Sequence, residues 1–502
     1  MTTKHTESTN GSSALRWGIF LVVLVAIFLL GMLAASITEK RAQVNSLYTS
    51  SKKVEITGIE SNNDKWGVNY PREFETWKET ANMDFKSKHL GNQVEDTLAA
   101  RPEMVVLWAG YAFSKDYNAP RGHMYAVKDI RESLRTATPQ NDTDGPMFGT
   151  CWTCKGPDVP RMMDKIGIDN FYASKWGALG HEVVNPIGCA DCHNPETMEL
   201  AITRPALVNA FQEQGRDVEK ASLQEKRSLV CAQCHVEYYF TNDKKTLVFP
   251  WKNGFKVEDM EKYYDGIEFA DWTHALSKTP MIKAQHPDYE LSLFGPHGQR
   301  GIACADCHMP YKSEGGVKFS NHQIMSPLNN ISGTCGTCHR DSEENLRKYV
   351  EDNQDRILEL RDRLEPELVK AHVMAKAAWD NGATEEEMAP ALKLIRQAQW
   401  RWDMSVASHG ASFHAPVETQ RIMASGLDKT MLAQLELQKV LFAHNVTDVE
   451  MPDLSSKEKA QAYIGLDMEK LKSEKETWKK TIVPQWLEKA KQNGILAASS
   501  PN

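Results

Sequence analysis

Hydrophobic residues follow three different patterns along the chain. A continuous apolar run, WGIFLVVLVAIFLLGMLAASI, lies near the N-terminus at residues 17–37. A long middle region is rich in Trp, Pro and Gly and shows little sustained helical periodicity. After it, apolar residues recur at the spacing of an amphipathic helix. We therefore expect three parts, with boundaries at 1–41, 42–340 and 341–502.

The third part predicts a mainly helical bundle. Its first helix begins after Asp341 with a capping serine and early acidic residues, and Asn381-Gly382 ends it. Amphipathic faces of this kind pack either on their own domain or against a partner helix. The apolar positions of the first helix are Leu346, Val350, Ile357, Leu360, Leu364 and Leu368. Further helices are expected over 385–402, 417–445, 456–474 and 478–492.

The N-terminal run is about as long as the 20 apolar residues that cross a bilayer. Ala34-Ala35-Ser36 has small residues at the spacing of a cleavage site, so a signal peptide and an uncleaved signal anchor both fit. The anchor is favoured because the run exceeds the usual signal core of about 7 to 15 residues. Lys40 and Arg41 follow the run, and the positive-inside rule alone would place them in the cytoplasm.

Composition narrows the function. The chain of 502 residues is long enough for more than one core. A formal net charge of −8, from 67 acidic and 59 basic residues, gives no basic field for a nucleic-acid backbone. All ten cysteines fall in five Cys-x-x-Cys pairs, which leaves none for a separate disulfide framework. The pairs are Cys151/Cys154, Cys189/Cys192, Cys231/Cys234, Cys304/Cys307 and Cys335/Cys338.

Four of the pairs are followed at once by histidine, which is the attachment motif of haem c. Two thiols on one turn add to the two vinyl groups of a haem, and the next residue can then ligate the iron. Zinc knuckles also use Cys-x-x-Cys, but they need no histidine immediately after each pair. Because haem is attached outside the plasma membrane, the motifs predict an exported domain despite the flanking charges. The expected proximal ligands are His193, His235, His308 and His339.

Electron-transfer haems usually carry a second axial ligand, so four more ligands are expected. Histidines in Gly- and Pro-rich loops are the best candidates, because such loops can present an imidazole ring at close range. His409 in ASHG competes with His414 in FHAP for one of these positions. The candidates are His123, His297, His322 and His414.

The remaining pair lies in CWTCK and is followed by Lys155. A neutral lysine can ligate iron if the metal's charge and burial displace its proton. An iron with no ligand on its other face would be open to a small molecule, whereas a degenerate motif would leave Lys155 without a role. We therefore predict a chain of bis-histidine haems that feeds one open haem, as in a multi-electron reductase of a small molecule.

Several longer stretches carry a family resemblance. CWTCK and the four histidine motifs occur together with RPEMVVLWAG, PRGHMYAV, CHVEYYF, KAQH, CADCHMP and RWDMSVASHG. With these features the chain resembles the pentahaem cytochrome c nitrite reductases, which form ammonium from nitrite. The resemblance implies a mainly α multihaem cytochrome c fold with little β-structure, in which a haem-packed core precedes a bundle of long helices.

The resemblance also implies roles for individual residues. Lys155 is the proximal ligand of the active-site haem, and His414 rather than His409 is a distal ligand. Arg135, Tyr238 and His286 are the expected substrate residues: a permanent positive charge, a neutral phenol donor and a proton donor. A calcium ion is expected at oxygen ligands near the substrate residues. Its ligands are Glu237, Tyr238, Lys283 and Gln285.

The family further implies a homodimer formed through the C-terminal helices. Electrons would come from a membrane quinol dehydrogenase or a small periplasmic cytochrome, and the enzyme would be periplasmic, tethered by the N-terminal segment if that is not cleaved. Two alternatives remain at this point. One is an electron-carrying multihaem cytochrome without a substrate, and the other is a multihaem reductase of hydroxylamine, sulfite or tetrathionate.

Overall fold

The computed structural model describes residues 11–48, 53–89 and 91–501. Its regular structure is mainly helical, which confirms the predicted class, and its strands form small antiparallel sheets. Residues 1–10 of the predicted N-terminal segment lie outside the described part. The paired strands are β1 (Tyr239–Phe240) with β2 (Leu247–Val248), β3 (Trp272–Thr273) with β4 (Pro280–Met281), and β5 (Tyr311–Glu314) with β6 (Val317–Ser320).

Short helices and loops build the region before residue 341. Prolines begin two of these helices, where the missing N–H costs nothing, and the elements stay short between them. The helices are α2 (Asn63–Asn69), α3 (Pro71–Lys78), α4 (Thr97–Ala100), α5 (Glu103–Leu107), α6 (Ala126–Glu132), α7 (Asp158–Ile166), α8 (Ile168–Ala173), α9 (Cys189–Cys192), α10 (Pro205–Glu213), α11 (Leu223–Ala232), α12 (Val257–Gly266), α13 (Asp288–Ser292) and α14 (Cys304–His308).

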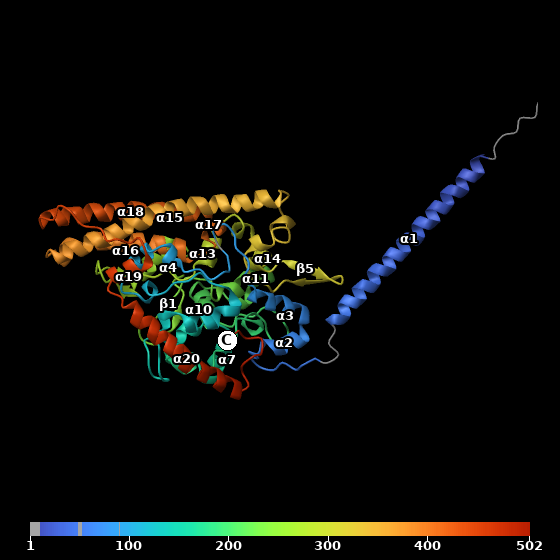
Figure 1. The fold of residues 1–502 in the computed structure, drawn as a ribbon, viewed down its shortest axis with the longest axis horizontal. Coiled ribbons are helices and arrows are strands. Elements are labelled where there is room, and N and C mark those ends of the chain that lie inside the picture. Colours follow the sequence, from blue (N-terminus) through green and yellow to red (C-terminus); the bar gives the residue numbers. More distant parts are fainter. Residues whose placement is uncertain (1–10, 49–52, 90, 502) are drawn as a thin grey trace, which may run out of the picture.

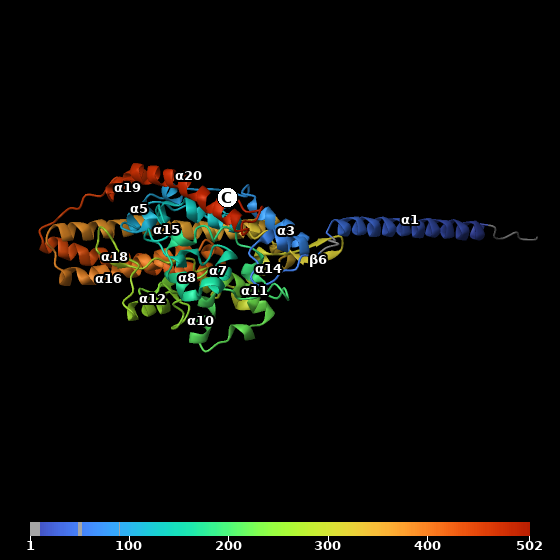
Figure 2. The same ribbon diagram turned by 90° about the horizontal axis from the view of Figure 1, so that it is seen from below.

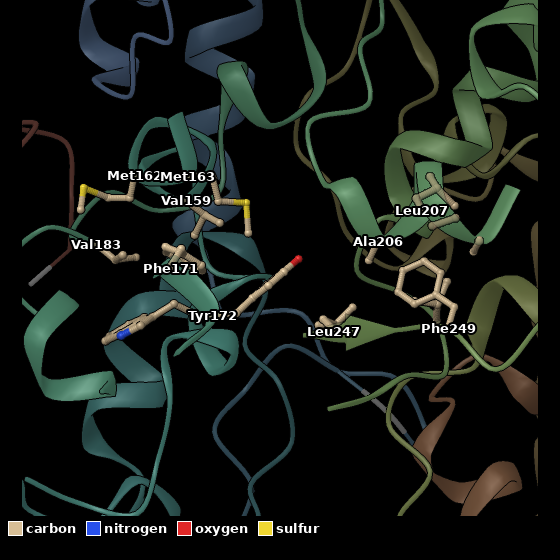
Figure 3. Packing of buried hydrophobic residues seen from close by; sticks show 14 of the residues in the cluster. Val159, Met162, Met163, Phe171, Tyr172, Val183, Ala206, Leu207, Leu247 and Phe249 are labelled. Atoms are coloured by element: carbon tan, nitrogen blue, oxygen red, sulfur yellow. The ribbon is translucent and has the colours of Figure 1, made fainter. Parts of the chain in front are cut away.

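The largest buried cluster of this region packs side chains from several of the short helices (Figure 3). Phe171 and Tyr172 of α8 lie near Val159 of α7, and Phe249 lies near Leu207 of α10. All of these side chains are nearly inaccessible to solvent. Their burial holds together a region in which no long helix or large sheet supplies a core.

The C-terminal region contains the longest helices after α1. α15 (Glu343–Asp380), α16 (Glu385–Ala407) and α18 (Pro416–Ala443) lie side by side along one edge of the molecule (Figures 1 and 2). Ser342 caps α15, and Thr384 with Glu387 forms a capping box on α16. These three helices were predicted with their ends only a few residues away. The short helix α17 (Ala411–His414) lies between α16 and α18 in the chain. The division into three parts stays a prediction, and its boundary at 341 falls just before α15.

The last two helices differ from the prediction. α19 (Lys457–Tyr463) is short, and α20 (Met468–Gln492) runs without a break through the gap expected between 474 and 478. Gly465 has a φ of 78°, which ends α19, and the Asp467 side chain accepts a hydrogen bond from the Lys470 amide at the start of α20. The predicted helices at 456–474 and 478–492 were therefore wrong in their boundaries, because turn chemistry at 465–467 decides where the helix restarts.

α20 leaves the bundle and crosses the region before residue 341 (Figure 1). Its Trp478 and Trp486 lie with their ring centroids 5.9 Å and 5.5 Å from that of Trp176. Trp176 in turn stacks at 4.8 Å on Trp152, the tryptophan of the CWTCK motif. The end of the chain therefore packs behind the motif that contains Lys155.

The N-terminal helix α1 (Gly11–Leu47) projects away from the rest of the chain (Figures 1 and 2). Among the described residues it is the one helix long and apolar enough to cross a membrane, which fits both an anchor and a signal segment. Near its C-terminal end, the Asn45 amide donates a hydrogen bond to the Gly315 carbonyl in the turn between β5 and β6, at 3.1 Å. That contact connects α1 to the hairpin.

Candidate functional site

Each cysteine pair lies on a short helical turn. α9 and α14 consist of their motifs, the Cys231 pair begins at the end of α11, and 3₁₀ turns hold the pairs at Cys151 and Cys335. In every pair except Cys335/Cys338, both cysteines line one cavity, as attachment to one haem requires. None of the ten cysteines is in a disulfide.

The CWTCK motif folds differently from three of its counterparts. The amides of His193, His235 and His339 donate to the carbonyl of the first cysteine in their motifs, at 2.8 to 3.0 Å. The Lys155 amide instead donates to the Trp152 carbonyl, at 2.9 Å. The backbone therefore turns more tightly before Lys155 than before these three histidines.

One large cavity of about 1660 Å³ connects the motifs. All the cysteines except Cys338 line it, and so do Lys155, Arg135, Tyr238 and His286. Its wall is mainly apolar, which suits the porphyrin faces that haem c presents. A cavity of this size inside a folded chain fits several bulky cofactors that take part in the core.

Cys338 differs from the other predicted haem-attachment residues. It is exposed and does not line the cavity, although Cys335 of the same pair does. The cause is its place in the chain: the 3₁₀ turn Cys335–Thr337 ends just before it, and residues 337–340 run along the surface toward α15. Attachment of haem to Cys338 stays a prediction.

Four pairs of histidines face one another with ring centroids 6.1 to 6.2 Å apart. A metal about 2 Å from each ring nitrogen, a usual metal–imidazole distance, fits such a gap. Each pair joins one motif histidine to one of the distal candidates, and the fourth pair uses His414 rather than His409. The residues present therefore fit bis-histidine haems. The pairs are His193 with His322, His235 with His123, His308 with His414, and His339 with His297.

Burial keeps several of these imidazoles neutral. It lowers the pKa of His123 to about 3, and it lowers the pKa values of His308 and His322 to about 4. The Nδ1 atoms of His193 and His308 lie 2.9 Å from the carbonyls of Met198 and Met325, which orients the rings. A neutral, oriented imidazole is the form that ligates a metal.

The predicted substrate residues line the same cavity as Lys155. The ring centroids of Tyr238 and His286 are 6.4 Å apart. The Arg135 guanidinium lies 4.5 Å from the ring centroid of Phe113, and its Nε donates to Ser133 Oγ at 3.0 Å. The structure therefore places a fixed positive charge and two ring side chains in the lining of one cavity.

Electrostatics assign protonation states to the two rings. Burial raises the pKa of Tyr238 well above its usual range, so its phenol stays protonated. Burial, followed by the charge of Lys155, lowers the pKa of His286 well below its usual range. Burial, the larger cause, does not depend on the protonation of Lys155. The imidazole is therefore neutral at rest and can donate a hydrogen bond from one ring nitrogen.

The predicted calcium ligands also lie together. Glu237 accepts hydrogen bonds from the Gln285 amide at 2.6 Å and from the Tyr264 hydroxyl at 2.8 Å, and the Gln285 side chain lies 3.0 Å from the Lys283 carbonyl. The Glu237 carboxylate is fully buried, and no ion pair involves it in the part of the chain that the structure describes. Burial therefore raises its pKa well above the usual range. A cation would supply the missing positive charge, so this oxygen-rich donor set fits calcium.

The structure adds residues that the sequence analysis missed. Asp288 places its carboxylate oxygens 3.5 Å from His235 Nδ1 and 3.8 Å from His414 Nδ1, between two of the histidine pairs. Glu290 accepts a hydrogen bond from the Glu237 amide at 2.8 Å. Both acids follow His286 closely in sequence, but no spacing rule distinguishes them from surface carboxylates.

Comparison with known proteins assigns the chain to a family. A model of the cytochrome c552 family matches residues 62–494. The cytochrome c-552 of Bacteroides fragilis is 63% identical over 482 residues, which are 96% of this chain and 98% of the relative. That of Parabacteroides distasonis is 61% identical over 482 residues, or 96% and 97% of the two chains.

A solved structure supports the predicted multihaem cytochrome fold. It is the catalytic subunit of the cytochrome c nitrite reductase of Desulfovibrio desulfuricans, which is described with two calcium sites. The match has a TM-score of 0.73 at 31% identity and covers 83% of this chain and 91% of that one. Together with the sequence matches, it shows that the chain belongs to the cytochrome c552 family.

Proposed function

We propose that the chain is an ammonia-forming nitrite reductase, an oxidoreductase that reduces nitrite to ammonium with six electrons. The reaction would take place at the haem c attached at Cys151 and Cys154, with Lys155 as proximal ligand. The observation that carries this proposal is the contrast among the five motifs. Four of them place a histidine 6.1 to 6.2 Å from a second histidine, whereas the fifth has a lysine next to a cavity lined by Arg135, Tyr238 and His286.

The haem, when bound, would supply electrons and an open coordination position for the substrate. The chain's own residues would do the rest. Arg135 carries a permanent charge and would hold a nitrite oxygen while neutralising the anion. Tyr238 stays protonated and would donate a hydrogen bond to the other side of the substrate. His286 would deliver protons as the oxygens leave as water, because a neutral imidazole can pass one proton and take up another.

Calcium would fix the loops that carry these residues. The proposed ligands are the Glu237 carboxylate, the Gln285 side chain and the carbonyls of Tyr238 and Lys283. The Glu237 carboxyl is buried and has no ion-pair partner among the described residues, which supports this set, and the Desulfovibrio relative is described with calcium sites. Because Tyr238 follows Glu237 and His286 follows Gln285, one ion would set the positions of both substrate residues.

We further propose a periplasmic homodimer that receives electrons from a membrane quinol dehydrogenase or a small cytochrome. α18 supports the dimer because it leaves several large apolar side chains exposed on one face. α1 supports membrane attachment because its length and composition suit a bilayer span. The exposed residues of α18 are Met431, Leu432, Leu435 and Phe442.

The deciding experiment measures ammonium formed per nitrite by the purified holoenzyme with a reduced viologen. We expect nearly one ammonium per nitrite and a high-spin haem signal in low-temperature electron paramagnetic resonance. Parallel assays with hydroxylamine, sulfite and tetrathionate test the other reductases. Turnover of another oxyanion without turnover of nitrite, or five low-spin haems with no turnover, would contradict the proposal.

A further inference from the structure

The helix α20 makes a polar contact with the segment that follows Arg135. Lys475 Nζ donates hydrogen bonds to Thr136 Oγ1 at 3.0 Å and to the Ala137 carbonyl at 2.8 Å. One turn later, Trp478 Nε1 donates to the Pro139 carbonyl at 2.7 Å. Lys475 and Trp478 are 2% and 1% exposed, so water cannot replace either donor.

The contacted segment is the second half of the turn that presents Arg135. This turn is η4 (Leu134–Thr136), and its first half is held by Ser133, whose Oγ accepts from the Arg135 amide at 3.2 Å. Ala137 follows with a φ of 56°, a left-handed conformation that is unfavourable for alanine. The surroundings must therefore hold the second half of the turn, and Lys475 and Trp478 supply donors to it.

Lys475 is costly to bury. It forms no ion pair with any described residue, and its Nζ lies 4.3 Å from the centroid of the Trp478 ring. The charged groups that face it are Asp116 and Glu132, which raise its pKa, and Lys479, which lowers it. Burial outweighs them and lowers the pKa of Lys475 to about 7. The two hydrogen bonds to Thr136 and Ala137 offset part of this cost, and they tie the buried lysine to the turn.

We propose that Lys475 and Trp478 are positioning residues that hold the turn 134–139 and thereby direct the Arg135 guanidinium into the cavity. The proposal rests on the proposed function, in which Arg135 binds nitrite. It extends the substrate site to a helix that begins more than 300 residues after the turn in the sequence. Neither residue touches the substrate in this account.

The test compares Lys475→Met and Trp478→Phe with Lys470→Met in the full-length holoenzyme. Lys470 lies on the same helix and its side chain is 67% exposed, which makes it a matched control. We expect Lys475→Met to raise the nitrite KM about tenfold through a weakened charged hydrogen bond, with kcat within about twofold. Amide hydrogen exchange at residues 134–138 should speed up in both test variants. The melting temperature of Lys475→Met should stay within about 2 °C of the wild type.

The readouts separate positioning from a structural role and from failure of the proposed function. Wild-type KM and wild-type exchange in both test variants would overturn the proposal, as would a large loss of melting temperature with no change in KM. If Lys475→Met does not fold, Trp478→Phe decides, because it keeps an aromatic ring and removes the hydrogen-bond donor to the Pro139 carbonyl. If the wild type reduces no nitrite, the proposed function fails, while exchange at 134–138 still tests whether α20 holds the turn.

Discussion

Two buried histidines outside the haem pairs make the chain sensitive to acid. The rings of His274 and His372 stack with centroids 3.7 Å apart. His274 Nε2 donates to the Val106 carbonyl at 2.8 Å, and His372 lies between Ser277 Oγ at 2.9 Å and Gln399 Oε1 at 2.7 Å. These contacts use the neutral rings, and a proton on either ring would bury a positive charge in the core.

This pair predicts a loss of stability below pH 6.5. Burial lowers the pKa of His372 to about 4 from 6.5, so between these values the unfolded chain binds a proton that the folded chain does not. The free energy of unfolding should therefore fall by about 3 kcal/mol for His372 alone as the pH drops from 6.5 to 4. Above pH 6.5 the pair should add no pH dependence. Denaturant unfolding at a series of pH values measures this slope.

His372→Gln should flatten the acid slope, because an amide keeps polar contacts without titrating. His444→Gln is the control, since His444 lies near the surface beside Glu387. An unchanged slope in His372→Gln would show that other groups cause the acid sensitivity. Neither His274 nor His372 was a candidate from sequence. They lie far apart in the chain, and no local motif marks a histidine whose partners come from distant helices.

At the scale of elements, the face of α18 should decide the oligomeric state. Leu435 is 54% exposed, and Phe442 lies on the same side two turns later. In a symmetric dimer each side chain occurs twice in the interface, so one substitution by a charged residue buries two charges and weakens association twice over. At micromolar protein concentration we expect the wild type to be a dimer and Leu435→Glu to be a monomer, as measured by light scattering. Ile267→Glu is the control, because it places the same charge on an exposed apolar residue elsewhere. A Leu435→Glu protein that remains dimeric would exclude this face.

How accurately the helix boundaries could be predicted from the sequence depends on which residues end each helix. α15, α16 and α18 have long apolar periodicity and caps such as Ser342 and Thr384, so their ends are visible in the sequence. The restart of α20 depends on Gly465 and Asp467, which are weak local signals within a charged stretch. The short helices around the cavity were not predictable one by one, because cofactors and distant contacts rather than periodicity determine where they begin.

The site was predictable where chemistry imposes a spacing. Cys-x-x-Cys-His and Cys-x-x-Cys-Lys indicate candidate haem sites directly, and the structure brings the four distal candidates opposite the motif histidines. The exposure of Cys338, and the roles of Asp288 and Lys475, could not be predicted in this way. They depend on which side chains lie beside each residue after folding, and that information is spread over the whole chain.

At the scale of the molecule, we expect the chain to keep its nitrite turnover when α1 is removed. A chain that starts at Val54 and is exported with a cleavable leader should appear in the soluble periplasmic fraction. Its viologen-driven nitrite turnover should stay within about twofold of the full chain, because α1 forms no hydrogen bond to Arg135, Tyr238 or His286 in the described residues. Turnover with a quinol donor in membranes should fall, because the shortened chain lacks the α1 tether that would raise the enzyme's concentration near its donor.

The control replaces residues 17–37 with an unrelated apolar membrane helix. This chain should return to the membrane fraction and recover the quinol-driven rate if attachment alone matters. Loss of viologen-driven turnover in the shortened chain would instead show that α1 supports the fold of the site. Membrane retention of the shortened chain would show that another surface binds the bilayer or a partner.

The position of α20 has a consequence for biosynthesis. In the proposed periplasmic enzyme, export would deliver the chain from its N-terminus, so CWTCK and the Arg135 turn would leave the membrane long before the helix that packs behind both. If export keeps pace with synthesis at about 5 to 20 residues per second, α20 would arrive roughly 15 to 60 s after Lys155. Haem can be attached in that interval while the cavity is still accessible, before Trp478 and Trp486 close over Trp176. A prematurely ended chain would then carry its haems without a fixed arginine at the substrate position, so completion of the last helix would switch on nitrite binding only in full-length molecules.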